Sequence, residues 1–94
     1  MKITEKEKYF LACVYNDVIQ DGDHGLVRYE LKRLDNYFIS HLTKKKVRMT
    51  WNLVCNLYTL LGQSVVGDMM MNGDITDQEF SNLENKFKNF LHIN

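Results

Sequence analysis

The sequence has no proline and only two cysteines among its 94 residues. Cys13 and Cys55 lie in separate segments, and they form no CxxC motif and have no histidine at metal-ligand spacing. These absences argue against a zinc finger and against a fold held by disulfides. We expect both cysteines to be free, buried thiols.

The sequence also lacks net charge, because twelve basic residues balance twelve acidic ones. No overall field therefore attracts the protein to nucleic acid or to an anionic membrane, and such binding would need a local patch. The N-terminal segment MKITEKEKYF lacks the apolar core of a signal peptide, so we expect a cytoplasmic protein. Hydrophobic residues make up 45% of the chain, enough for one small core and a single domain over residues 1–94.

Charge is missing altogether from one stretch. Between Met49 and Gly67 there is no Asp, Glu, Lys, Arg or His, although 26% of the whole sequence is charged. A helix on the surface of a soluble protein normally carries charges on its wet face. The stretch therefore predicts a central helix that other helices cover on several sides.

Apolar periodicity and capping signals predict four helices, at about residues 5–20, 26–42, 45–72 and 77–91. Capping boxes mark two starts, Thr4 with Glu7 and Thr76 with Glu79, and Asn72-Gly73 is typical of a helix end. No segment alternates with the period of a strand. We therefore expect an all-α fold, a small four-helix bundle with a long central third helix and an αα-hairpin formed by the last two helices.

Two details of this prediction depend on weaker signals. Residues 43–46 contain neither Gly nor Pro, so this segment is either a loop or the start of the third helix. In the second helix one stripe recurs at helical spacing and is expected to face the core. Its residues are Val27, Leu31, Leu34, Phe38 and Leu42. A similar stripe in the first helix ends at Ile19.

Metal and catalytic motifs are incomplete. The segment Asp21–Gly25 resembles the opening of a calcium loop, but Leu26 and Lys32 stand where the motif needs Gly and Glu. The segment from Asp68 to Glu79 fails similarly, because Met70 stands at the third position. The three histidines are scattered, and no triad, HExxH or phosphate-binding loop occurs. We expect no metal, no cofactor and no enzymatic activity.

The predicted third helix carries the first candidate site, a stripe of uncharged polar residues that continues to the methionine cluster Met69–Met71. Amides and hydroxyls facing themselves across a two-fold axis can satisfy each other's hydrogen bonds, and interface cores are depleted in charge. The stripe therefore predicts a homodimer interface or, as a further alternative, a small-ligand or nucleotide pocket with Tyr58 or Trp51 nearby. Its residues are Asn52, Asn56, Thr59, Gln63, Gly67 and Met70.

A basic cluster offers an alternative of another class. Four cations can hold phosphates and a nearby aromatic ring can stack on a base, which is the chemistry of nucleic-acid binding. The cluster consists of Lys44, Lys45, Lys46 and Arg48, with Trp51 one turn further on. Net neutrality and the lack of a helix-turn-helix pattern make this the secondary hypothesis.

Together these patterns favour a non-catalytic protein-interaction module that binds and modulates or inhibits a partner protein. A membrane span over residues 53–71 is disfavoured because the segment is too polar. Nine Lys against three Arg, with nine Asn, is typical of AT-rich genomes. Small size and a lone helical bundle are similarly typical of proteins that phages and mobile elements make to redirect a host factor.

Overall fold

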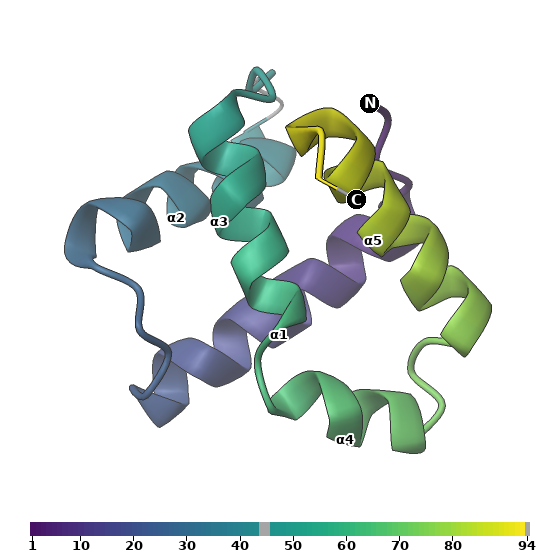
Figure 1. Cartoon of the computed structure of the whole chain (residues 1–94). Helices are drawn as coiled ribbons and strands as arrows, with labels where there is room; N and C mark the ends of the chain where they lie inside the picture. Colours follow the sequence, from purple (N-terminus) through teal and green to yellow (C-terminus); the bar gives the residue numbers. More distant parts are fainter. Residues whose placement is uncertain (44–45, 94) are drawn as a thin grey trace.

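A computed structural model describes residues 1–43 and 46–93, with the exception of the His41 side chain. This part of the chain contains five α-helices and no strand (Figure 1), so the predicted all-α class is confirmed. The helices are α1 (Glu5–Asp21), α2 (Arg28–Thr43), α3 (Trp51–Leu61), α4 (Val65–Met71) and α5 (Asp77–Leu91). None of the described helices is long and apolar enough to cross a membrane.

The two predicted capping boxes start α1 and α5. The Thr4 hydroxyl oxygen accepts a hydrogen bond from the Glu7 amide at 3.1 Å, and the Thr4 amide donates to the Glu7 carboxylate at 2.9 Å. Thr76 and Glu79 repeat this arrangement at 3.1 and 3.0 Å. Because each box satisfies two backbone N–H groups that the helix itself leaves free, the predicted starts agree with the structure.

The single helix predicted over residues 45–72 is wrong. Residues 46–50 are not helical, and α3 starts at Trp51 because the Thr50 hydroxyl accepts the Leu53 amide at 3.2 Å. The chain then breaks at residues 62–64, where the Gly62 amide donates to the Thr59 carbonyl in a tightened last turn. Gly62 and Ser64 stand at this break, and both residue types are weaker helix formers than Ala or Leu. The lack of charge from Met49 to Gly67 therefore did not indicate one continuous helix.

This break changes how the last helices pack. The predicted partner of the C-terminal helix was the whole third helix, but α5 packs against α3, whereas α4 packs against α1. The helix α3 also contacts α1 and α2, and Figure 1 shows it crossing the middle of the molecule. The central position predicted from the lack of charge therefore applies to α3 alone.

One hydrophobic core joins all five helices. Its largest fully buried side chains are Leu11, Leu34, Leu53, Leu57, Leu60, Leu83 and Phe87. Three residues predicted to face this core do not, since Leu42 is 81%, Val27 48% and Ile19 42% exposed. Leu42 lies in the last turn of α2. Residues 46–50, which were predicted to belong to the third helix, are not helical, so they form no helix that could cover it. Tyr37 and Ser40 are buried instead.

Candidate functional site

The centre of the predicted polar stripe is an internal contact. Asn56 is only 3% exposed and lies between α2 and α3. Its side-chain oxygen accepts a hydrogen bond from Arg33 Nη1 at 2.6 Å, and its amide nitrogen donates to Glu30 Oε2 at 2.8 Å. Both partners belong to α2, so this polar bridge fixes the position of α2 on α3. Asn56 is therefore unavailable to a dimer partner, contrary to the prediction.

The other five residues of the stripe belong to two helices and to the turn between them. Gln63 Nε2 donates to the His24 carbonyl at 3.3 Å, which ties the α3–α4 turn to the loop before α2. Asn52 and Thr59 are exposed on α3, whereas Gly67 and Met70 belong to α4. The prediction assumed that one continuous helix runs through residues 62–64 and keeps all these residues on one face. The helix breaks there, so residues before and after the break no longer share a face.

The alternative of a ligand pocket along the same stripe meets a similar difficulty. A surface groove of about 480 Å³ does run past Tyr58, Thr59 and Gln63. The Tyr58 ring, however, packs edge-on against Phe87, with 6.5 Å between the ring centroids. Trp51 does not line this groove. The aromatic groups expected to hold a ligand are thus used for packing or lie elsewhere.

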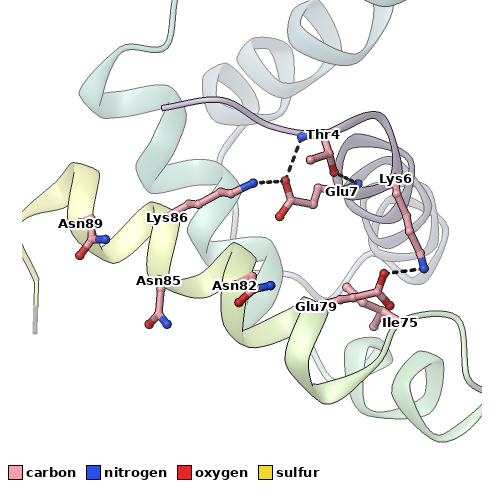
Figure 2. Close-up of a pocket in the computed structure, with 9 residues that line it drawn as sticks. All are labelled: Thr4, Lys6, Glu7, Ile75, Glu79, Asn82, Asn85, Lys86 and Asn89. Atoms are coloured by element: carbon pink, nitrogen blue, oxygen red, sulfur yellow. Dashed lines mark hydrogen bonds and ion pairs between the residues drawn. The ribbon is translucent and has the colours of Figure 1, made fainter.

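A second groove lies between the N-terminal end of α1 and α5 (Figure 2). Its volume is about 460 Å³, and ion pairs cross it from Lys86 to Glu7 at 2.6 Å and from Lys6 to Glu79 at 2.5 Å. The Lys6 ammonium, followed by the Thr76 backbone, lowers the pKa of Glu79 to about 2. These ion pairs join α1 to α5, so the four charged groups that cross the groove are already paired within the fold.

Three amides of α5 line the same groove, and sequence reasoning missed them. Asn82, Asn85 and Asn89 recur at helical spacing and are exposed. Figure 2 shows their side chains along one side of α5. Because Asn is a poor helix former, three of them on one face were a signal available in the sequence. Amides alone define no particular ligand.

Four large apolar side chains are exposed near the end of α2, in the connecting segment and at the start of α3. Leu42 is 81%, Trp51 52%, Ile39 52% and Val47 38% exposed. Two exposed cations, Lys46 and Arg48, lie between them in the connecting segment. We call this set the junction surface: Ile39, Leu42, Lys46, Val47, Arg48 and Trp51. In Figure 1 the end of α2 and the start of α3 lie at the same end of the molecule.

The junction surface contains three of the residues predicted for nucleic-acid binding. Lys46, Arg48 and Trp51 are all exposed, whereas Lys44 and Lys45 lie outside the described residues. The sequence from Asn36 to Gly67 contains no Asp or Glu, so this region carries cations without neighbouring carboxylates in sequence. The predicted basic cluster thus coincides with an apolar surface that the sequence did not indicate.

Titratable groups elsewhere serve packing. Burial, followed by a hydrogen bond to Asp35 at 2.6 Å, raises the pKa of the Tyr15 hydroxyl. Burial, with Glu5 and Glu7 nearby, raises the pKa of Tyr37 to about 12. Among the described residues no group of three or more His, Cys, Asp or Glu side chains is placed to hold a metal ion. Cys13 and Cys55 are free and only partly buried.

Comparison with known proteins adds no relative. No protein-family model matches the sequence, and the searches found no matching curated protein or solved structure. The geometry of the described residues is therefore the basis for any proposal about function.

Proposed function

We propose that this protein is a non-catalytic interaction module that binds an acidic surface of a partner protein through the junction surface, and thereby modulates or inhibits that partner. The observation that carries the proposal is the exposure of two large apolar side chains, Leu42 in the last turn of α2 (81%) and Trp51 at the start of α3 (52%). Burying a large apolar side chain in a complex contributes about 1.5–3 kcal/mol. Because these side chains are exposed in the folded protein, burying them against a partner would contribute to the free energy of binding.

The residue types also fit a protein interface. Trp and Arg are enriched among the residues that dominate binding energy, and Trp51 and Arg48 both belong to the junction surface. Lys46 and Arg48 add positive charge beside the apolar side chains, and opposite charge on a partner would speed association and fix its orientation. An acidic protein surface with an apolar centre is the complementary partner.

Nucleic acid is the competing partner for the same cations. Interfaces with nucleic acid are more polar and more positively charged than interfaces between proteins. Ile39, Leu42 and Val47 have no side-chain donor for a phosphate, yet all three are exposed. The apolar side chains therefore favour a protein partner, and nucleic acid becomes an outcome of the test. A phage or mobile-element origin stays a prediction from composition.

The test is affinity capture from a bacterial lysate with and without nuclease, using the wild type and two matched variants. The junction variant is Leu42→Gln with Trp51→Gln, and the control is Tyr29→Gln, which changes a side chain that is 66% exposed on α2. Circular dichroism and melting temperature check that all three proteins fold alike.

We expect the wild type and the control to capture the same protein, and the junction variant to lose it. Capture should survive nuclease and weaken with salt, because the charged rim of the interface is screened. Capture that nuclease abolishes would assign the surface to nucleic acid. Capture that the junction variant retains in full would overturn the proposal.

A further inference from the structure

Three aspartates of the protein line a groove that does not include the junction surface. The sequence has no Lys or Arg from Met49 to Asn85, and it has none from Tyr9 to Val27. The structure brings parts of these two stretches together, because α4 packs against α1. Asp17, Asp68 and Asp74 line one groove of about 600 Å³ between the two helices. We call it the acidic groove.

Apolar side chains accompany these carboxylates. Phe10 and Met69 line the acidic groove, and so does Tyr9, which is 73% exposed. One cation, Lys6, also lines the groove, but its ammonium pairs with Glu79 at 2.5 Å. The groove therefore combines three carboxylates, which form no ion pair with another of the described residues, with accessible apolar area.

The two charged regions are separate in space. Figure 1 shows α4 at the lower end of the molecule, and the start of α3 at the upper end. The molecule measures 31 × 29 × 25 Å. Because the Debye length is about 10 Å at 0.1 M salt, charges at opposite ends are largely screened from each other. A net charge of zero therefore does not prevent the two cations of the junction surface and the three carboxylates of the acidic groove from acting separately.

We propose that a second copy of this chain is a partner of the junction surface, docked head to tail in the acidic groove. Lys46 and Arg48 of one copy face Asp17 and Asp74 of the next. Trp51 and Leu42 supply apolar area against Tyr9. The inference rests on the proposed role of the junction surface and names one occupant for it, chosen by complementary charge and apolar content.

Such an interface joins two different surfaces, so each complex leaves one junction surface and one acidic groove free. Head-to-tail interfaces close into rings only if the rotation between copies permits, and otherwise form open chains. Self-association should therefore extend beyond a dimer as concentration rises, unlike the symmetric dimer that the polar stripe predicted. It should also weaken with salt, because its charges lie at the surface.

The test is charge reversal followed by mixing. The reversed-groove variant, Asp17→Lys with Asp74→Lys, makes the groove basic, and the reversed-junction variant, Lys46→Glu with Arg48→Glu, makes the junction surface acidic. A control, Arg28→Glu with Lys32→Glu, makes the same change in net charge as the reversed-junction variant, at exposed positions of α2. Sedimentation velocity measures the average mass of each protein, and circular dichroism checks folding.

We expect the wild type and the control to associate at high micromolar concentration in about 20 mM salt and to dissociate in about 500 mM salt. Each reversed variant alone should stay monomeric, and their equimolar mixture should associate again, because opposite ends now meet. A wild type that is monomeric in low salt, or a mixture that stays monomeric, would overturn head-to-tail docking. Lysate capture that depends on Leu42 and Trp51 would still support the proposed function in that case.

Discussion

Two positions on α3 combine polarity and burial in opposite ways. Asn56, a polar residue in the middle of the helix, is 3% exposed, whereas Trp51, a large aromatic residue at its start, is 52% exposed. The difference follows from what lies opposite each residue. Arg33 and Glu30 of α2 complete the hydrogen bonds of Asn56, while Trp51 follows the non-helical residues 46–50.

This comparison changes where a binding surface should be sought. At the centre of α3 the uncharged polar residue, Asn56, is one whose hydrogen bonds the fold satisfies internally. The junction surface carries charge, but its apolar side chains contribute little to the fold. The informative feature is therefore an exposed large apolar group beside unmatched charge, and not an uncharged stripe.

The largest expected effect comes from placing a charge at the buried position. Asn56→Lys removes the acceptor of Arg33 and adds a second cation beside it, so we expect more than about 4 kcal/mol of destabilisation or an unfolded protein. Asn52→Lys makes the same change at an exposed position of α3 and should alter stability by less than about 0.5 kcal/mol. Urea unfolding measures both. Equal effects would contradict the polar bridge.

A pair of leucines tests the same distinction for apolar residues. Leu57→Ala removes a fully buried side chain and should cost about 2–5 kcal/mol. Leu42→Ala, at a position predicted to be buried but 81% exposed, should change the free energy of unfolding by less than about 0.5 kcal/mol. A large loss for Leu42→Ala in urea unfolding would show that this residue belongs to the core.

The smallest expected effect is on the pH dependence of stability, and it comes from the surface ion pair between Lys6 and Glu79. The pKa of Glu79 falls from its ordinary value of 4.5 to about 2, so ionised Glu79 favours the folded state. This stabilisation is complete above about pH 4.5 and is lost as pH falls towards 2. We expect Lys6→Met to weaken this dependence.

Melting temperatures between pH 5 and pH 2 measure the effect. Lys2→Met is the control, since Lys2 is an exposed lysine of the same segment and is not the partner of Glu79. The change should be small because the pair is partly solvated. Identical pH profiles for the wild type and Lys6→Met would show that Lys6 does not shift the pKa of Glu79.

Local signals predicted the parts of the fold that local interactions determine. The capping boxes at Thr4 and Thr76 placed two helix starts correctly, because both partners of each hydrogen bond lie within one turn. The break at residues 62–64 was missed, since Gly62 is tolerated inside many helices and only packing decides whether the chain bends there. Because that helix was predicted to be too long, residues before and after the break were wrongly assigned to one face.

The candidate site shows the same division. Lys46, Arg48 and Trp51 were recognisable as a basic cluster with an aromatic residue because they are close in sequence. The exposure of Leu42 could not be recognised in the sequence. Leu42 recurs with the apolar stripe of its helix, as a core residue would, and its surroundings depend on where α3 starts. The acidic groove also escaped notice, since Asp17 and Asp74 meet only through the packing of α4 on α1.

The position of Trp51 has a practical consequence. It is the one tryptophan of the chain, and it lies half-exposed on the junction surface. Intrinsic fluorescence excited selectively at the indole therefore reports on this surface without any label. A shift of its emission to shorter wavelength on adding a partner, or on concentrating the protein itself, would mean that water has left this part of the molecule.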